Sequence, residues 1–412
     1  MHEPAALPGR TRALARVTDA PGRADVLTWL LHVSHTLSPS DLPATVAHAI
    51  ARLGARSSCI YLVDHDQQVL HPFPARPGHT GSFNADGTIG GRAFALESTI
   101  TVPVESGITL WVPLLDGTAR MGVLRADLDA ASATDDRSIE LVEQVASLAA
   151  ELIVSKARYT DDVEWARRGQ PMSLEAELQR CSLPPGALVT PSVSVAGMLL
   201  PAYEVAGDSF DYSLNQDSLD VAVIDSVGHE VLSSVISHLV YGSLRNSRRN
   251  RLDLPAAYRA ADAAVAKVFP DVRFATAAFG RLDLTSGRFR WVCAGHPPPL
   301  LVRNGKVVGE PPTVPTLPIG LGGTDIAVNE VVLEAGDHLL LYTDGVTEGG
   351  TPGAEQFGLA RLTDLLGRTL LDGLPPAETL RRLVGAVQRH SAYRLRDDTT
   401  MVLICFHQTM HS

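Results

Sequence analysis

Four acidic points in the second half of the chain lie at or beside the ends of apolar segments. They are Asp208 in VAGDSFDY, Asp225 in VIDSVGHE, Asp344 in LYTDGVTE and the pair Asp397-Asp398 in RLRDDTTMVLICF. Carboxylate and carbonyl oxygens are the ligands that Mg²⁺ and Mn²⁺ prefer, and these ions bind few protein carboxylates beside several waters. A cluster of three or four aspartates could hold two such ions about 4 Å apart and lower the pKa of a bridging water.

Each of these aspartates also has an ordinary structural interpretation. Asp344-Gly345 alone is a turn signal that would end a strand in a hairpin, and Asp208 alone is a loop residue. The short side chain of aspartate has little freedom once its backbone is fixed. Gly228 and Gly345 also permit tight turns that direct a carboxylate outward. All four acidic points occur in one half of the chain, each with its own flanking residues. Their combination favours a metal site over four separate structural roles.

Apolar segments that the sequence predicts as strands and helices must position these carboxylates. Strands are expected at about 218–224, 274–283, 287–294, 298–303, 306–309, 338–343 and 399–406. Helices are expected at about 229–247, at 254–268 and from Pro376, since proline suits a first helical turn. The sequence therefore predicts a mixed α+β module that begins at about Val189.

A module of ordinary domain size precedes it. Apolar residues recur at helical spacing over 25–53, hairpins are predicted at Ser57–Phe73 and Ile108–Leu128, and a single helix is predicted over 135–168. This last helix carries the alternating four-three spacing of a coiled-coil seam at Leu141, Val145, Leu148 and Leu152. We therefore expect a homodimer that forms through this helix.

Composition limits the classes of function. Of the 412 residues, 45% are hydrophobic and 20% are charged, which is ordinary for globular domains, and the formal net charge of −11 argues against nucleic acid as a partner. The sequence shows no signal-peptide core and no stretch of membrane-spanning length, so we expect a cytoplasmic protein with no membrane partner. The predicted division is a flexible tail, a sensor domain, a helical linker and a catalytic domain, at 1–22, 23–155, 156–185 and 186–408.

Six motifs in residues 173–407 resemble the SpoIIE/RsbU-type serine phosphatases, the bacterial branch of the metal-dependent PPM (type 2C) family. They are ELQRCSLPP, PAYEVAGDSFDY, VAVIDSVGHE, CAGHPPPLLVR, LLLYTDGVTEG and RDDTTMVLIC. The resemblance implies an αββα sandwich with a cluster of two or more Mn²⁺ or Mg²⁺ ions at one edge. It also implies hydrolysis of phosphoserine or phosphothreonine on a partner protein. The partner that the resemblance suggests is a phosphorylated anti-sigma-factor antagonist.

Carried over by position, the resemblance implies that Asp208, Asp225, Asp344 and Asp397 are the catalytic metal ligands. Asp397 is preferred to its neighbour Asp398, because the first acid of the family's terminal pair is the one expected at the metal. The carbonyl of Ser226 is a further candidate donor, and Asp398 stays in the candidate ligand set. Residues expected to support the ligands are Asp211, Gly228, His229 and Gly345.

Some residues in this region leave alternatives open. Glu230 stands where the family's D-x-x-G-H-G motif has its last glycine; it is favourable to a helix dipole, but it could also crowd the metal site or act as a further ligand. His229 and His296 could act as general acids, although hydrogen bonds within their own turns are the favoured interpretation. The run Arg245–Arg251 is expected to be a solvated helix end, with a docking patch for an acidic phosphoprotein as the alternative.

The N-terminal module resembles a GAF domain in SSCIYLVDHDQQVL, GTIGGRAFAL and LWVPLLDGTARMGVLRADL. In that family such modules bind small molecules, bind chromophores or dimerise, so a small-molecule ligand of this module is a further expectation, and no cofactor-binding residue is assigned. Tyr61 and Trp111 could line a pocket, but core packing is the favoured interpretation. The predicted fold is thus α+β: a GAF-like sensor domain, a helical linker and an αββα phosphatase domain.

Two functions from different classes remain. The favoured one is a signal-regulated metal-dependent protein serine/threonine phosphatase. The alternative is a non-catalytic scaffold or sensor protein that keeps the phosphatase fold and acts by binding. The four acidic points argue for the enzyme, and Glu230 argues weakly for the binding protein.

Overall fold

The computed structural model describes residues 25–74, 81–117, 119–132, 135–203, 207–228, 231–271, 273–350, 355–392, 395 and 397–407. The chain forms two compact units, the first made of residues up to Asp116 with Arg120–Gly169, and the second beginning at Gln170. None of the helices in the described residues combines the length and the apolar character that a membrane-spanning helix needs. The four-part division predicted from the sequence stays a prediction.

The first unit is built on a six-stranded antiparallel sheet in the order β3-β2-β1-β6-β5-β4. Its strands are β1 (Ala55–Val63), β2 (Val69–Phe73), β3 (Phe83–Asn84), β4 (Ile100–Val104), β5 (Gly107–Asp116) and β6 (Ala119–Asp129). Its helices are α2 (Val26–Ser34), η2 (Pro39–Asp41), α3 (Leu42–Arg52), α4 (Ile89–Leu96), α5 (Asp136–Ala157) and α6 (Asp162–Arg167). Both predicted hairpins are present, as β1–β2 and β5–β6.

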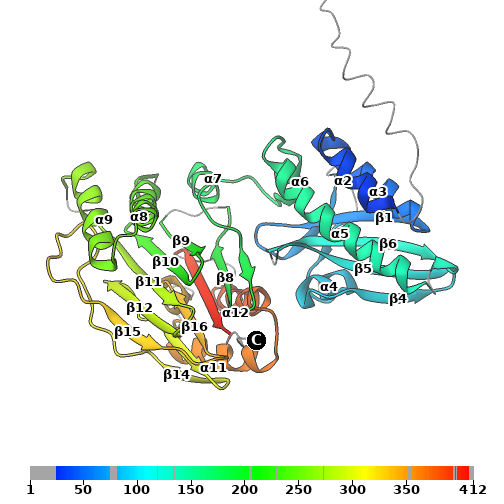
Figure 1. Cartoon of the computed structure of the whole chain (residues 1–412). Coiled ribbons are helices and arrows are strands. Elements are labelled where there is room, and N and C mark those ends of the chain that lie inside the picture. Colours follow the sequence, from blue (N-terminus) through cyan, green and yellow to red (C-terminus); the bar gives the residue numbers. More distant parts are fainter. Residues whose placement is uncertain are drawn as a thin grey trace, which may run out of the picture. The chain divides into compact units, whose positions relative to one another are not determined.

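Helices α2, α3, α5 and α6 pack on one face of this sheet and share one hydrophobic core (Figure 1). The other face carries a smaller cluster with α4, in which Tyr61, Phe83 and Trp111 pack edge to face or tilted against one another. Tyr61 and Trp111 therefore act as packing residues, as favoured from the sequence. The GAF-like assignment of this unit stays a prediction.

The single helix predicted over 135–168 is wrong. Helix α5 ends at Ala157, and α6 resumes at Asp162, where its backbone N–H is bound by the hydroxyl of Thr160 at 3.1 Å. The break lets α6 bury its own apolar residues in the same core, and Arg167 donates a hydrogen bond to the carbonyl of Val63 at 3.0 Å. The helical pattern therefore continues in two separate segments.

The predicted coiled-coil seam faces the interior of its own unit. Val145 is fully buried in the core, and Leu141, Leu148 and Leu152 are partly buried against it. The buried positions Val142, Val145, Ala146, Ala149, Ala150 and Ile153 follow ordinary helical spacing for a helix that packs on a sheet. The seam thus gives less support to a homodimer than its spacing suggested, and the homodimer stays a prediction.

The second unit consists of two stacked sheets. One has the order β15-β12-β11-β10-β9, and the other has the order β14-β13-β16-β17-β8-β7. The strands are β7 (Ala187–Val189), β8 (Val193–Leu200), β9 (Ser209–Leu214), β10 (Ser218–Ser226), β11 (Ala275–Asp283), β12 (Arg288–Ala294), β13 (Leu300–Arg303), β14 (Lys306–Gly309), β15 (Asn329–Val332), β16 (His338–Tyr342) and β17 (Thr399–Phe406). A core of facing apolar side chains, including Trp291, Phe289 and Phe210, fills the space between the sheets.

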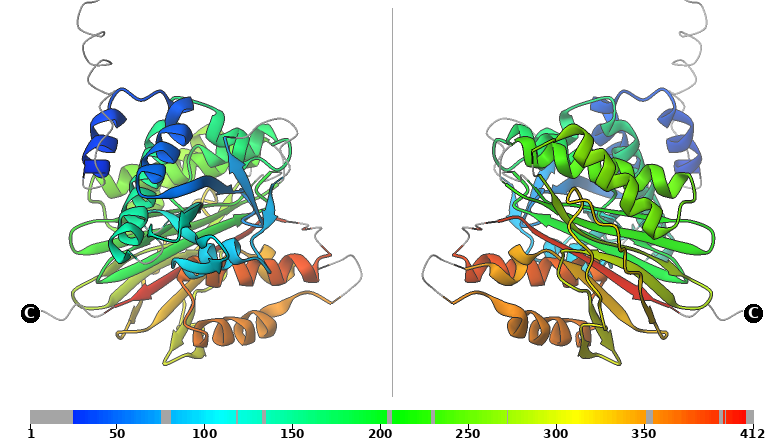
Figure 2. Two further views of the ribbon diagram at one scale, coloured as in Figure 1. Left: turned by 90° about the vertical axis from the view of Figure 1, so that its right-hand side faces the viewer. Right: turned by 90° about the vertical axis from the view of Figure 1, so that its left-hand side faces the viewer.

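Helices cover the outer faces of both sheets. α8 (Val231–Arg249) and α9 (Leu254–Val268) lie on the first sheet, while α11 (Gly358–Leu371) and α12 (Pro376–His390) lie on the second. Figure 2 shows the resulting four layers, with green helices on one side and orange helices on the other. Two short helices, α7 (Leu174–Arg180) and α10 (Asp344–Glu348), complete the unit. Since the order is helix, sheet, sheet, helix, the predicted αββα arrangement is present.

The sequence predicted seven of the eleven strands of this unit to within a few residues and did not predict β7, β8, β9 or β15, nor the helices α10 and α11. The Asn304-Gly305 turn joins β13 to β14 with both residues at positive φ, which a two-residue hairpin of this kind requires. Asp344, by contrast, does not begin a hairpin turn. It is the first residue of α10.

Candidate active site

The predicted aspartates come from the ends of strands in both sheets of the second unit. Asp225 is the last residue but one of β10, and Asp208 directly precedes its neighbour β9. Asp344 follows β16 after one residue, and Asp397-Asp398 directly precede β17, the neighbour of β16 in the other sheet. The sandwich therefore brings together carboxylates that are almost 200 residues apart in the chain.

Asp208 is held by hydroxyl groups from the opposite sheet. Its side chain is 2% exposed, and its Oδ2 accepts hydrogen bonds from Thr343 Oγ1 at 2.7 Å and from Thr400 Oγ1 at 2.6 Å. These two threonines are themselves joined, because the backbone N–H of Thr400 donates to Thr343 Oγ1 at 3.0 Å. Asp208 is thus fixed across the gap between the sheets.

Asp398 holds the backbone that precedes β9. Its Oδ2 accepts hydrogen bonds from the backbone N–H groups of Gly207 at 2.8 Å and Asp208 at 3.1 Å. Gly345 packs against the backbone of Asp398 itself, and a side chain on Gly345 would overlap the carbonyl oxygen of Asp398. Close approach, rather than a positive φ, is therefore the reason for glycine at this position, whereas Gly228 does have a positive φ of 105°.

The two acids of the terminal pair differ in their surroundings. Asp398 is 7% exposed and bound by backbone amides, whereas Asp397 is exposed and accepts a hydrogen bond from the N–H of Asp398 at 3.0 Å. Asp397 lies close enough to Asp225 and Asp344 to raise the pKa of both. This arrangement favours Asp397 as a ligand and Asp398 as a support.

Burial and mutual repulsion raise the pKa of three of the aspartates. Burial raises the pKa of Asp225 to about 7, assisted by the charges of Asp344, Asp397 and Asp398. Burial, together with Asp225 and Asp398, raises the pKa of Asp208 well above its ordinary value. The pKa of Asp344 is raised by burial and by Glu348 and Asp397. Like charges are thus gathered in a poorly solvated place, which is unfavourable without a cation.

The donor chemistry fits a hard divalent cation, since the side chains offer carboxylate oxygens and repel one another. The arrangement as it stands does not enclose an ion: within the described residues, no three His, Cys, Asp or Glu side chains are placed so that they could hold one. Ser226, whose carbonyl is a candidate donor, is fixed by its hydroxyl, which lies 2.9 Å from the carbonyl of Gly207 and 2.7 Å from that of Ser233.

The candidate histidines differ in what can be said of them. His229 and Glu230 lie outside the described residues. His296 follows β12 and is 5% exposed, and burial lowers its pKa to about 3. A ring that stays neutral at physiological pH is a poor general acid. Its Nδ1 lies 2.8 Å from Thr276 Oγ1 on β11, so its hydrogen bond does not stay within its own turn.

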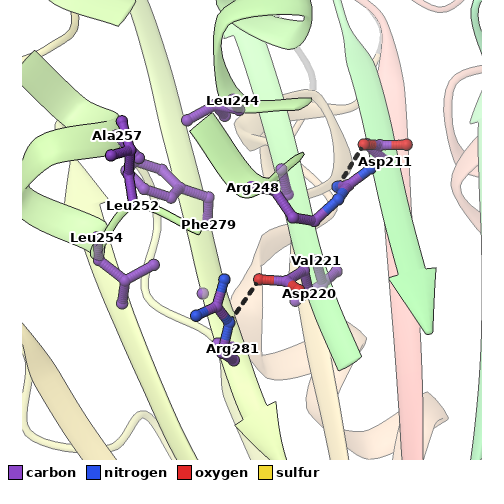
Figure 3. Close-up of a pocket in the computed structure, with 12 residues that line it drawn as sticks. Asp211, Asp220, Val221, Leu244, Arg248, Leu252, Leu254, Ala257, Phe279 and Arg281 are labelled. Atoms are coloured by element: carbon purple, nitrogen blue, oxygen red, sulfur yellow. Dashed lines mark hydrogen bonds and ion pairs between the residues drawn. The ribbon is translucent and has the colours of Figure 1, made fainter. Parts of the chain in front are cut away.

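Asp211 faces away from the acidic cluster. Its carboxylate, 3% exposed, accepts hydrogen bonds from Arg245 at 2.8 and 3.1 Å and from Arg248 at 2.9 Å. Figure 3 shows the second of these pairs beside a small pocket of about 40 Å³ between α8, α9 and the sheet. The expected supporting role of Asp211 at the ligands therefore has no basis in these contacts. The expectation of a solvated helix end is also wrong for Arg245 and Arg248.

The hydroxyl residues that support the acids were not predicted from the sequence. Thr343 and Thr400 bind Asp208, and the hydroxyl of Thr276 makes a hydrogen bond that lowers the pKa of Asp225. A weak signal was available, because Thr343 directly precedes Asp344 and Thr400 follows the terminal pair. Their partners, however, lie 135 and 192 residues away and depend on the pairing of whole strands.

Comparison with known proteins decides the family of this unit. Residues 215–407, which include β10 to β17, match the family model of stage II sporulation protein E (SpoIIE). This part of the chain is by that match a SpoIIE-type domain. The predicted phosphatase family and the mixed α+β fold are thereby confirmed for the SpoIIE-type domain.

Individual relatives are more distant. Protein IcfG of Synechocystis sp. is 26% identical over 140 residues, which cover 32% of this chain and 20% of IcfG. The RsbU and RsbW domains of a Mycobacterium tuberculosis protein are 29% identical, with a TM-score of 0.48, over 53% of this chain and 62% of theirs. The SiaA-PP2C domain of Pseudomonas aeruginosa is 21% identical, with a TM-score of 0.47, over 56% of this chain and 94% of that domain. The chain thus spans a fifth of IcfG and less than two thirds of the Mycobacterium chain.

Proposed function

We propose that the protein is a metal-dependent protein serine/threonine phosphatase. The observation that carries this proposal is the meeting of Asp208, Asp225, Asp344 and Asp397 at one edge of a SpoIIE-type domain, where burial and repulsion raise the pKa of the first three. Carboxylates that are costly to ionise in isolation are suited to share a multivalent cation.

In this proposal the ligands are Asp208, Asp225, Asp344 and Asp397, with the carbonyl of Ser226 as a further donor. Two or more Mn²⁺ or Mg²⁺ ions, when bound, would supply a water of lowered pKa and neutralise charge on the phosphoryl group. Thr343 and Thr400 hold the carboxylate of Asp208, while Asp398 holds the backbone of residues 207–208. These contacts keep the donors in place, which is how a rigid site favours an in-line displacement.

The substrate that the family resemblance suggests is phosphoserine or phosphothreonine on a partner protein of the anti-sigma-factor antagonist type. This is an argument by analogy, because a fold accommodates many substrates. The same analogy suggests that the first unit is a GAF-like sensor that binds a small molecule and regulates the catalytic domain, that the protein forms a homodimer, and that it acts in the cytoplasm.

A non-catalytic binding protein is the second candidate. The observation that favours it is Glu230, which stands where the family motif has its last glycine. Hydrolysis assays with and without Mn²⁺, on p-nitrophenyl phosphate and on a phosphoserine protein, separate the two functions. If the protein is an enzyme, we expect metal-dependent release of phosphate that is lost in Asp225→Asn. The Asp220→Asn variant should keep this activity, because Asp220 lies outside the cluster and pairs with Arg281 on the neighbouring strand. Binding of a partner protein without any phosphate release would support the second candidate.

A further inference from the structure

Helix α8 carries an apolar stripe on the side that points away from the sheet it covers. Leu232 and Val235 are 42% and 38% exposed, Leu239 is half-buried and Gly242 is exposed. These four residues, here called the α8 stripe, follow one another at intervals of three, four and three, so they lie on one side of the helix. The buried residues of α8 occupy the opposite side. In a single copy of the chain the stripe therefore faces outward.

Gly242 has no explanation within a single copy. Glycine in the interior of an exposed helix is less favourable than alanine. The backbone here is helical, and no described atom of the chain lies within 4 Å of the position that a Cβ on Gly242 would take. A second helix would give the glycine a purpose, because a missing side chain lets two helices approach closely.

The α8 stripe fits a second copy of itself in the antiparallel direction. In a two-fold pair of α8 helices centred on position 237, Leu232 lies opposite Gly242 of the second copy, and Val235 lies opposite Leu239. The large side chain of Leu232 can then fill the space beside the glycine. Val235 and Leu239 of both copies form the apolar centre of the contact.

The charges of α8 favour the antiparallel direction over the parallel one. Its basic residues lie near its C-terminus, and residues 231–244 contain no Lys, Arg, Asp or Glu. Arg245 and Arg248 are bound by Asp211, whereas Arg249 is exposed. A parallel pair would bring the two basic ends together. An antiparallel pair separates them and directs each toward the acidic cluster that precedes α8 in the second copy, so the charges are complementary.

Helix α7 enlarges this apolar surface. Leu174 and Leu178 of α7 are exposed, and the carbonyl oxygen of Leu178 lies 3.2 Å from Nε2 of His238 on α8. The buried side of α7 carries Ala176 and Gln179, so this helix exposes its larger apolar side chains. A stable interface covers roughly 800 Å² on each partner. The leucines of α7 add area beside the α8 pair.

We propose that the α8 stripe is the interface of a homodimer in which two copies pack through antiparallel α8 helices, with α7 beside them. The proposal rests on the homodimer included in the proposed function and assigns its interface to the second unit.

The test is the dimer dissociation constant of the full-length protein, measured by light scattering and analytical ultracentrifugation over a dilution series. Val235→Glu places a charge at the centre of the pair in both copies and should raise this constant roughly a hundredfold or more. Val308→Glu is the matched control, because Val308 is also exposed but lies on β14 in the other sheet. It should keep the wild-type constant. Circular dichroism checks that each variant is folded.

Leu232 and Gly242 test the register of the two helices. Gly242→Leu should weaken the dimer because two leucines then meet, although a side chain at this position has open space in a single copy. Leu232→Ala combined with Gly242→Leu exchanges the large and the small position across the pair and should recover roughly tenfold of the lost affinity. Gly242→Ala should also weaken the dimer. It should raise the melting temperature at dilutions where the protein is monomeric, because alanine favours the helix.

Two results would overturn the inference alone. One is a folded Val235→Glu protein that dimerises as tightly as the wild type. The other is a double variant that dimerises no better than Gly242→Leu, which excludes the antiparallel register.

A monomeric wild type would contradict the proposed homodimer, and this inference would fail with it. If Val235→Glu then lowered kcat/KM for a phosphoserine protein but not for p-nitrophenyl phosphate, the occupant of this face would be the substrate protein. Phosphate release by the wild type is measured separately. Its absence, together with a dimer that Val235→Glu dissociates, would contradict the proposed phosphatase and support this interface.

Discussion

Asp225→Asn should make the metal-free protein more stable while abolishing its activity. The substitution keeps the size of the side chain and an oxygen that can accept the Thr276 hydrogen bond, but it removes a charge that burial and three neighbouring aspartates oppose. Improved stability and lost catalysis from one change is the expected signature of a site that is strained for function.

The magnitude follows from the pKa. In the folded protein the pKa of Asp225 rises from 3.8 to about 7, and each tenfold change in proton affinity corresponds to about 1.4 kcal/mol. At pH 8 the ionised carboxylate therefore costs the folded state roughly 4 kcal/mol relative to the unfolded chain, and asparagine removes up to that amount. For a unit of this size the melting temperature should rise by up to roughly 8–16 °C.

The pH dependence has a definite sign. Between pH 3.8 and about 7 the folded state binds more protons at Asp225 than the unfolded state does, so stability falls as the pH rises through this range and is constant above it. Lowering the pH from 8 to 6 should therefore stabilise the metal-free wild type through this residue by roughly 1 kcal/mol. The Asp225→Asn variant should lack this contribution.

The assay is thermal or urea unfolding in EDTA at pH 6 and pH 8, followed by phosphoserine hydrolysis with Mn²⁺. Asp220→Asn is the matched control, because Asp220 lies on the same strand, β10, and its carboxylate accepts from Arg281 at 2.8 Å. This control should be neutral or destabilising by about 1 kcal/mol, and it should remain active. If metal-free Asp225→Asn is no more stable than the wild type at pH 8, the electrostatic account of the cluster is wrong.

The remaining predictions concern the other ligands, regulation and assembly. Asp344→Asn should remain folded, lose nearly all phosphoserine hydrolysis and show a smaller thermal shift with Mn²⁺; near-normal turnover at saturating Mn²⁺ would contradict the two-metal proposal. Asp397→Asn should reduce the rate more than Asp398→Asn, whereas Asp398→Ala should lower the melting temperature because two backbone N–H groups lose their acceptor. Deletion of residues 1–170 should change the phosphatase rate and preserve its metal dependence. Equal rates for the full-length and truncated proteins, measured with each candidate ligand, would count against coupling between the first unit and the catalytic domain. Light scattering at micromolar concentration should give the mass of a homodimer, and a monomer would remove that proposal.

The sequence was informative wherever a structural signal is local. In β10 an apolar run leads directly to Asp225, and β16 is followed after one residue by Asp344, so both strands and their carboxylates could be predicted. Strand β8 was missed for the opposite reason. All eight residues of β8 are buried, as are those of β17, so neither strand shows the alternation of a half-exposed strand; the difference is Gly197, which interrupts the apolar run of β8 and lies under the ring of Phe210.

The contacts that organise the site could not be predicted, because they join strands that are distant in the chain. The hydroxyls of Thr343 and Thr400 meet Asp208 only after β16 and β17 have paired in one sheet and packed against the other. The same limit explains Asp211, which resembles a site residue in the motif GDSFDY but pairs with two arginines of α8. Proximity in sequence to Asp208 gave no information about the direction of its side chain.

In the terminal pair, the geometry of the extended chain places two adjacent aspartates in different surroundings. Successive residues of an extended chain point to opposite sides, so two adjacent aspartates before a strand cannot both face the same place. In the SpoIIE-type domain Asp398 turns inward and binds the amides of residues 207–208, which also carry Asp208, and Asp397 is left exposed near Asp225 and Asp344. One acid can then be occupied by the protein so that the other stays available for a cation. This difference in surroundings is why we expect asparagine at position 397 to impair catalysis more than asparagine at position 398.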